Sequence, residues 1–490
     1  MYFSLNRDEY KYELENICRL FFPSKKIISS DNIPDSELFA SVEFSEDGEK
    51  TVIVCKCGWN SKTSKQTVIA DIVSKEYNKE LELAAARGLY TVFSYLTGFS
   101  PKWGILTGVR PAKLFSFIKA QEGREGARSV FKEQYLVDES KIDLCETTCH
   151  AEKRALDLSF PESFSLYVSI PFCPSRCRYC SFVSHSIANA GKLVPGYVEL
   201  LCEEIKQIGI ISKNIGLKLS TVYFGGGTPT QLSAEHLDRL LCAVEQSFDL
   251  SHISEYTVES GRPDTVTREK LLTLKAHGVD RISINPQILD DKVLENIGRK
   301  HTVAQFYQAF NLAKQVGFNT VNTDLIAGLS GDTAEGFFKT VDGIISLKPE
   351  NITVHTLAMK RSSSYVEGGN GVYAAESKMV SEMIEVSSKM LYKADYSPYY
   401  LYRQSKCLGN HENVGWSKKG HDCLYNIYMM NELHTVLAAG AGAVSRLKDP
   451  AGGHIERIFN FKYPYEYINR FGQILQRKEK TGEFYEKFPF

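Results

Sequence analysis

Three cysteines within eight residues form the group in this sequence that is best suited to chemistry. Cys173, Cys177 and Cys180 come directly after an apolar run at 166–170, and an aromatic residue, Tyr179, precedes the last of them. Thiolates at this spacing can converge on one metal centre, and soft sulfur ligands select iron–sulfur clusters or zinc. Three ligands are one fewer than a closed site of either kind uses, which favours a cluster with one open position. On spacing alone, a zinc site or a chance grouping is the alternative.

A glycine-rich stretch at 225–230 follows the next apolar run, 221–224. Consecutive glycines let backbone N–H and C=O groups approach a ligand closely. In isolation, a Gly-Gly-Gly sequence is more often a tight turn. Because this one lies a single strand–helix unit after the cysteines, we expect it to bind a ligand beside them.

Four polar residues follow the later apolar runs, namely Glu259, Gln287, Arg299 and Asp324. Each alone is more often solvated or structural. Together, two carboxylates, an amide and a guanidinium can hydrogen-bond a ribose, an adenine and the charges of an amino acid. In a barrel of parallel strands, such residues gather at the carboxyl ends of the strands.

Short β-rich runs alternate regularly with amphipathic stretches between residues 166 and 356. The predicted strands are 166–170, 221–224, 256–259, 281–285, 321–326 and 352–356. The predicted helices are 198–211, 234–248, 267–276, 303–316 and 334–347. Repeated strand–helix units imply parallel strands joined by right-handed crossovers. Six such units predict an α/β fold, and they suit a partial (βα)6 barrel of the TIM type better than the alternative, a short open sheet.

Two further regions flank the barrel, so we expect three domains. They are an α+β accessory domain at 1–160, the partial barrel at 161–365, and a helix-rich domain at 366–490 that covers the substrate. The first is expected to contain a hairpin at 42–55, with an Asp-Gly turn. In the last, the Gly- and Asn-rich segment 408–416 is expected to be a loop that closes the site.

The composition is that of an ordinary globular protein, with 43% hydrophobic and 24% charged residues. Lys plus Arg number 58 and Asp plus Glu 59, and the net charge of -1 gives no field that attracts nucleic acid. No apolar run reaches membrane-spanning length and no signal-peptide pattern opens the chain, so we expect a cytoplasmic protein. The 12 cysteines are then thiols or metal ligands. Those expected only to pack are Cys202, Cys242, Cys407 and Cys423.

The Cys-x3-Cys-x2-Cys pattern, with an aromatic residue before its last cysteine, resembles the radical S-adenosylmethionine superfamily. The resemblance implies a 4Fe–4S cluster on Cys173, Cys177 and Cys180, whose open iron is chelated by the amine and carboxylate of S-adenosylmethionine. It also implies that an electron from the cluster cleaves the sulfonium. The resulting 5′-deoxyadenosyl radical then abstracts a hydrogen from the substrate.

Motifs across 165–358 resemble one branch of that superfamily, the oxygen-independent coproporphyrinogen III oxidase family. They are Tyr167, the Ile-Pro-Phe-Cys173 opening, the Gly-Gly-Gly-Thr-Pro-Thr of 225–230, Glu259, the Arg-Ile-Ser-Ile-Asn-Pro-Gln of 281–287, Arg299, Asp324 and Ala358. The stretch 103–113, Trp-Gly-Ile-Leu-Thr-Gly-Val-Arg-Pro-Ala-Lys, resembles the HemZ-type coproporphyrinogen dehydrogenases.

This resemblance assigns roles to individual residues. Tyr167 is implied to act with the three cysteines in catalysis. The residues implied to contact the iron-bound S-adenosylmethionine are Tyr167, Gly226, Gly227, Thr228 and Glu259. Those matching a second S-adenosylmethionine are Tyr179, Gln287, Arg299, Asp324 and Ala358. The chain departs from the family at Pro286, where the family often has valine, and proline fixes φ and removes a donor there.

The implied reaction is the radical oxidative decarboxylation of two propionates of coproporphyrinogen III to vinyl groups, giving protoporphyrinogen IX in haem biosynthesis. The implied partners are the tetrapyrrole, a reductant such as flavodoxin or ferredoxin, and an electron acceptor that the sequence does not name. A tetracarboxylate needs cationic anchors, and the candidates are Arg110, Lys113, Arg361 and Arg403.

Two alternative functions share the barrel. One is a haem chaperone, a non-oxidase relative that carries a His-Asn-x-x-Tyr-Trp element. The comparable stretch here keeps His421 and Tyr425 but has Asp422 and Asn426 at the other two positions. The other is a radical methyltransferase acting on haem, which would share nearly all of these motifs.

Overall fold

The computed structural model describes residues 1–23, 25–30, 37–71, 77–180, 182, 184–358, 373–404 and 407–490. The chain divides into two compact units. The first unit comprises Met1–Cys149, Val366–Ile384 and Leu401–Glu412, and the second comprises His150–Tyr365, Glu385–Tyr400 and Asn413–Phe490. The three-domain division at 160/161 and 365/366 stays a prediction. Arg361, one of the candidate anchors, lies outside the described residues.

The first unit is built on a five-stranded sheet with the order β2-β1-β3-β4-β5. Its strands are β1 (Tyr2–Leu5), β2 (Ile28–Ser29), β3 (Phe39–Asp47), β4 (Lys50–Trp59) and β5 (Lys62–Asp71). Its helices are α1 (Lys11–Phe21), α2 (Tyr77–Thr97), α3 (Pro111–Ser129) and the first part of α4 (Glu139–Leu156). The hairpin expected at 42–55 is formed by β3 and β4, and Gly48 takes φ +64° in its turn.

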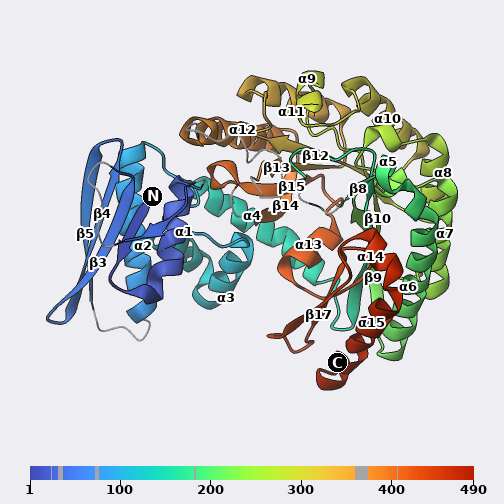
Figure 1. Cartoon of the computed structure of the whole chain (residues 1–490), viewed down its shortest axis with the longest axis horizontal. Helices are drawn as coiled ribbons and strands as arrows, with labels where there is room; N and C mark the ends of the chain where they lie inside the picture. Colours follow the sequence, from blue (N-terminus) through green and yellow to red (C-terminus); the bar gives the residue numbers. More distant parts are fainter. Residues whose placement is uncertain are drawn as a thin grey trace. The chain divides into compact units, whose positions relative to one another are not determined.

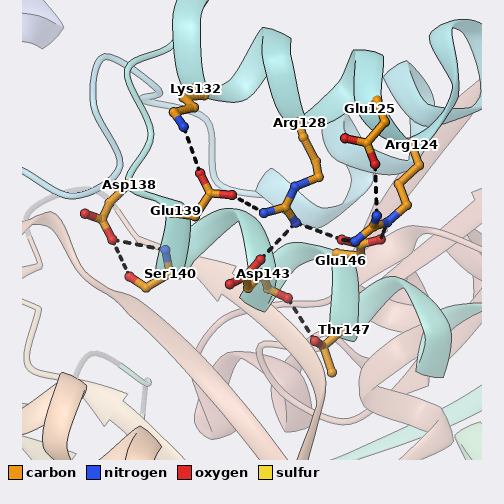
Figure 2. Close-up of polar contacts among 10 residues, drawn as sticks. All are labelled: Arg124, Glu125, Arg128, Lys132, Asp138, Glu139, Ser140, Asp143, Glu146 and Thr147. Carbon is orange, nitrogen blue, oxygen red and sulfur yellow. Dashed lines mark hydrogen bonds and ion pairs between the residues drawn. The ribbon is translucent and has the colours of Figure 1, made fainter.

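Helices α3 and α4 are joined by a cluster of ion pairs near the solvent, drawn in Figure 2. The Arg128 guanidinium lies 2.8 Å from the carboxylate of Asp143 and 2.9 Å from that of Glu146, and it also donates to Glu139. Arg124 reaches Glu146 from the next turn of α3. Exposed pairs of this kind contribute little individually, so we expect the cluster to add only modestly to stability.

The second unit contains the barrel. Its 11-stranded sheet has the order β14-β15-β13-β12-β11-β10-β9-β6-β16-β17-β18. The parallel strands are β6 (Ser163–Ile170), β9 (Lys218–Gly226), β10 (Glu255–Glu259), β11 (Arg281–Ser283), β12 (Thr320–Ala327) and β13 (Asn351–Thr356). The helices between them are α6 (Val194–Asn214), α7 (Ala234–Ser247), α8 (Arg268–Ala276), α9 (Asp291–Asn296), α10 (Val303–Val316) and α11 (Ala334–Leu347). Figure 1 shows these helices, from green to gold, as a layer outside the strands. The six predicted strand–helix units are therefore confirmed.

The two faces of the parallel strands differ in chemistry because successive residues of a strand point to opposite faces. One face of the strands is apolar and buried, and it includes Val222, Val258 and Val321, which are 0% exposed. The alternate residues of the same strands are polar, and several contact one another across strands. Ser165 bonds Thr221 at 2.7 Å, for example. Barrel interiors are usually filled by branched apolar side chains, so the polar inner face here suits a site for a polar ligand.

The C-terminal region contributes strands as well as helices. Its helices are α12 (Tyr373–Lys393), α13 (Leu424–Asn431), α14 (Pro464–Asn469) and α15 (Phe471–Lys487). Its strands are β14 (Ser397–Arg403), β15 (Glu412–Ser417), β16 (Thr435–Ala439), β17 (Val444–Lys448) and β18 (Ile455–Phe459). None of the helices in the described ranges combines the length and the apolar content that crossing a bilayer requires.

The expectation of a loop at 408–416 is wrong for most of that segment. Residues 412–416 belong to β15, which pairs antiparallel with β13. Glycine misled the prediction here, because Gly415 serves packing: a Cβ at this position would lie 2.0 Å from the ring of Tyr400. A glycine inside a strand often marks such a close approach.

Candidate active site

The three cysteines lie on the loop that follows β6. Cys173 ends the short strand β7 (Phe172–Cys173), which pairs with β8 (His185–Ser186), and the Cys180 N–H donates to the carbonyl of Cys177 at 3.2 Å. The Thr228 hydroxyl donates to the sulfur of Cys173 at 3.5 Å. The pKa of the Cys173 and Cys180 thiols is raised above its ordinary value, mainly because the two groups are buried. A bound metal would replace these protons, as thiolate ligation requires.

Arg262 supports this loop and was not predicted. Arg262 is 3% exposed. Its guanidinium donates to the Ser175 carbonyl at 3.2 Å and lies 3.7 Å from the sulfur of Cys177. Ser175 in turn donates from its hydroxyl to the carbonyl of Gly298 at 3.1 Å. These hydrogen bonds hold the cysteine loop against the segment that follows β10. The only sequence signal for Arg262 is its position three residues beyond the end of β10.

The glycine turn after β9 packs directly on the cysteine loop. Gly226 adopts φ +100°, a conformation that favours glycine, and the Gly227 N–H donates to the carbonyl of Ile170 at 2.7 Å. A Cβ on Gly227 would lie 3.0 Å from the sulfur of Cys173 and 2.7 Å from the carbonyl of Phe172. The turn therefore forms a cradle that a side chain would fill. This geometry fits the expected role of the glycines beside a metal-bound ligand.

Glu259, at the end of β10, lies among tyrosines. The Tyr223 hydroxyl donates to Glu259 Oε1 at 2.5 Å. The Tyr223 ring stacks on that of Tyr425 with centroids 4.3 Å apart, and Tyr425 stacks on Tyr167 at 6.1 Å. Burial raises the pKa of Glu259 to about 7, the Tyr223 hydrogen bond opposes the shift, and the charge of Asp324 adds to it. Sequence reasoning found Tyr167 and Glu259 but missed Tyr223 and Tyr425 as their partners.

Asp324 is held differently. Asn285 donates from Nδ2 to Asp324 Oδ2 at 2.7 Å, and Asn322 donates to Oδ1 at 2.8 Å. The His355 ring lies 3.9 Å from Oδ2. Burial alone would raise the pKa of Asp324, but His355, Asn322 and their neighbours outweigh it and leave the pKa below the ordinary value. Asp324 is thus an ionised carboxylate, whereas Glu259 titrates near neutrality.

The residues matched to a second cofactor surround the turn after β11. Arg299 donates to the Asn285 carbonyl at 2.6 Å and to the Tyr179 hydroxyl at 3.3 Å. Gln287 adopts φ +69°, and its N–H donates to the carbonyl of Asp324 at 3.0 Å. Pro286 is thus accommodated, because the backbone donor that this turn uses belongs to the next residue. Ala358 lies two residues beyond the end of β13.

The amino ends of the same strands carry a second polar group around a cavity of about 250 Å³. Arg281 donates to the carbonyl of His421 at 3.0 Å. Glu255 accepts from the backbone N–H groups of Leu424 and Tyr425, at 2.8 and 3.2 Å, and from the thiol of Cys423. The stretch that contains His421 and Tyr425 is therefore built into the barrel through contacts with its own strands.

One candidate anchor is not available to a substrate. Arg403 is buried in the first unit, donates to the carbonyls of Leu106 and Gly108, and lies 5.2 Å from the ring of Trp103. Trp103 in turn donates from its indole to Glu412 at 2.7 Å. Trp103, Leu106 and Gly108 of the 103–113 stretch therefore have structural contacts within the first unit. Arg110 and Lys113 also belong to the first unit.

Comparisons with known proteins agree with this geometry. Residues 167–344 match the sequence profile of the Radical SAM superfamily. The chain is 36% identical over 486 residues to "Oxygen-independent coproporphyrinogen-III oxidase-like protein HemZ" of Bacillus subtilis, covering 98% of this chain and 97% of that protein. It is 31% identical to "Heme chaperone HemW" of Lactococcus lactis, covering 65% of this chain and 79% of that one. In fold, it matches the coproporphyrinogen III oxidase HemN of Escherichia coli with a TM-score of 0.52 and 22% identity, over 65% of this chain and 71% of that chain.

Proposed function

The chain belongs to the radical SAM superfamily, in the family of HemZ-type oxygen-independent coproporphyrinogen-III oxidase-like proteins, and on this premise we propose that it oxidatively decarboxylates coproporphyrinogen III. Two propionates become vinyl groups, and the product is protoporphyrinogen IX. The cofactors of the superfamily are a 4Fe–4S cluster and S-adenosylmethionine. One observation carries the proposal: a loop with three thiols packs against a glycine turn, and the same turn lies beside the carboxylate of Glu259 at the neighbouring strand end.

The residues present fit a cluster held by three cysteines. Cys173, Cys177 and Cys180 share one loop, whereas Cys202 and Cys242 lie on the outer helices α6 and α7. When bound, the cluster supplies the electron that cleaves the sulfonium of S-adenosylmethionine.

The protein's own groups would bind and orient S-adenosylmethionine. The backbone of Gly227 and the hydroxyl of Thr228 border the sulfur of Cys173, and Gly226 precedes them in the same turn. The amino-acid end of the cofactor is expected here. Glu259 offers a carboxylate for ribose hydroxyls or an ammonium, and Tyr223 fixes its orientation. The tyrosine stack fills the space beside Glu259 with ring surface, which excludes water from a reactive intermediate.

The polar inner face of the barrel supports a polar substrate. Among the described residues, the hydroxyls of Thr257 on β10 and Ser283 on β11 are buried without a hydrogen-bond partner in the protein. Buried polar groups are costly unless they are paired. A bound carboxylate or ordered water would satisfy them, which suits a tetrapyrrole that carries four carboxylates. We propose that flavodoxin or ferredoxin delivers the electron that cleaves the cofactor, and that a separate electron acceptor takes the electron released by the substrate.

The test is anaerobic reconstitution of the cluster, followed by reductant, S-adenosylmethionine and coproporphyrinogen III. Formation of 5′-deoxyadenosine together with protoporphyrinogen supports the proposal, and Cys177→Ala serves as the cluster-free control. Cofactor cleavage that yields methylated or ring-opened haem, without the vinyl product, indicates the methyltransferase instead. The similarity to a haem chaperone favours one more outcome to measure, namely tight haem binding with neither cleavage nor turnover.

A further inference from the structure

A second group of metal-binding side chains lies on the outer helices, away from the cysteine loop. Asp238, Cys242 and Glu245 are spaced i, i+4 and i+7 on α7, so they share one face of that helix. His277 forms the C-cap of the neighbouring helix α8 and turns its ring toward this face. Four donors of three chemical types thus meet between two helices.

Their geometry is that of a ligand set. One donor atom each of Asp238, Cys242 and His277 lie within 4.8 Å of one another. The Nε2 of His277 is 2.9 Å from Asp238 Oδ1, and its Nδ1 is 2.7 Å from Glu245 Oε1. The His277 side chain is only 13% exposed, whereas those of Asp238 and Glu245 are 55% and 40% exposed. The ring is therefore fixed in place while the carboxylates remain accessible to an ion from solvent.

We propose that Asp238, Cys242 and His277 hold one divalent transition-metal ion such as Zn²⁺. Nitrogen, sulfur and carboxylate oxygen are the ligands that zinc uses, and three protein ligands leave a fourth tetrahedral position for water. Glu245 has a different role. Metal-bound histidines usually donate their second ring N–H to a carboxylate, which fixes the tautomer and the ring plane. Glu245 accepts from Nδ1 in this way and leaves Nε2 to the ion.

Binding would tie α7 to the end of α8. The ion forms bonds to Nε2, Sγ and an Asp238 oxygen, and the protons on Nε2 and Sγ pass to solvent. Because α8 ends shortly before β11 (Arg281–Ser283), the ion anchors the segment that leads into a barrel strand. The site is independent of the reaction proposed above, since none of its residues belongs to the cysteine loop or to the strand ends.

The experiment uses the full chain with its cluster loaded, treated with a chelator and kept anaerobic. Cobalt(II) is the probe, because a bound thiolate adds a charge-transfer band and a tetrahedral site gives visible d–d bands in the difference spectrum. Competition with a chromophoric zinc chelator then gives stoichiometry and affinity. We expect one ion per chain, with neither the thiolate band nor tight uptake in Cys242→Ser, and no uptake in His277→Gln.

Two further variants separate ligand from neighbour. Glu245→Gln keeps all three ligands and is expected to weaken binding by roughly 10–100-fold. Cys202→Ser removes a half-buried thiol on the adjacent helix α6 and is expected to bind as the wild type does. The proposal is overturned if the wild-type chain takes up no cobalt or zinc at this stoichiometry. It is equally overturned if Cys242→Ser and His277→Gln bind the ion unchanged.

Discussion

Two glutamates on one strand show how the ends of the barrel differ. Glu255 and Glu259 begin and end β10, and both point to the inner face. Glu255 accepts hydrogen bonds from Cys423, Leu424 and Tyr425, so both oxygens of its carboxylate are held by the protein. Within the described ranges, Glu259 accepts one hydrogen bond, from Tyr223, and burial raises its pKa to about 7.

This difference separates buried polar groups that stabilise the fold from those that can still bind a ligand. At the amino end, Glu255 and Arg281 are matched by partners on the chain itself, so replacing them should alter stability. At the carboxyl end, Glu259 can accept further hydrogen bonds from a ligand, and the thiols of the cysteine loop are free to bind a metal. Residue type does not distinguish the two glutamates, but the number of protein donors around each one does.

The strongest test of this contrast replaces one cysteine at each end of the barrel by alanine. Cys177→Ala is expected to abolish the 4Fe–4S absorbance and all 5′-deoxyadenosine formation, because two thiolates cannot hold the cluster. Cys423→Ala removes a buried cysteine from the amino end and is expected to keep both properties. Iron and sulfide content, with the cofactor-cleavage rate, measures each variant. Loss of the cluster in Cys423→Ala would contradict the division between the two ends.

The pH dependence of stability should depend on Glu259. Its pKa is raised in the folded state, from 4.5 to about 7, so the folded chain holds this proton more tightly than the unfolded chain. The associated stabilisation is full below pH 4.5 and is lost as the pH rises through about 7. Its size is on the order of 3 kcal/mol, since each unit of pKa difference corresponds to about 1.4 kcal/mol. Denaturant unfolding without S-adenosylmethionine should show this loss in the wild type and not in Glu259→Gln.

The two glutamates should also separate binding from stability. Glu259→Gln is expected to weaken S-adenosylmethionine binding by roughly 10–100-fold, the value of one hydrogen bond to a charged group. Glu255→Gln should leave that affinity within twofold and lower the free energy of unfolding by roughly 1–3 kcal/mol, because an amide cannot accept from all three donors. Anaerobic calorimetry measures the first quantity and denaturant titration the second. The reverse pattern would refute the assignment of the two ends.

The smallest effect is expected in the ion-pair cluster of the first unit. Arg128 contacts three carboxylates in the cluster of Figure 2, yet Arg128→Ala should lower the free energy of unfolding by only about 1 kcal/mol. The loss should shrink further at high salt, because exposed pairs are screened. Denaturant unfolding in 0.05 M and 1 M salt measures both. A loss well above about 1 kcal/mol that persists at high salt would show that the number of partners, and not burial, sets the cost.

Local pattern was enough to predict the barrel. The runs 321–326 and 352–356 correspond to β12 and β13, and the predicted helices at 303–316 and 334–347 match α10 and α11 residue for residue. Hydrophobic periodicity, threonine caps and Gly317 at a helix end are all local signals. The same is true of the cysteine loop, whose spacing lies within eight residues.

The missed residues depend on contacts between distant segments. Arg262 meets Cys177 from 85 residues away, and Tyr425 reaches the ring of Tyr223 from the C-terminal region. Neither partner has a spacing that sequence alone can detect. The same limit explains 408–416, since only the Tyr400 ring packed on Gly415 reveals why a glycine is needed in that strand.

The position of β6 in the sheet constrains when the protein can mature. The strand that leads into the cysteine loop lies between β9 and β16, and Ser165 bonds His434 across 269 residues of chain. At translation rates of about 5–20 residues per second, β6 waits on the order of 15–50 s on the ribosome before its second neighbour is synthesised. Throughout that time one edge of β6 has no partner strand. Assembly factors that deliver iron and sulfide should therefore meet a cysteine loop whose supporting strand gains its second neighbour only after the C-terminal segment has been synthesised.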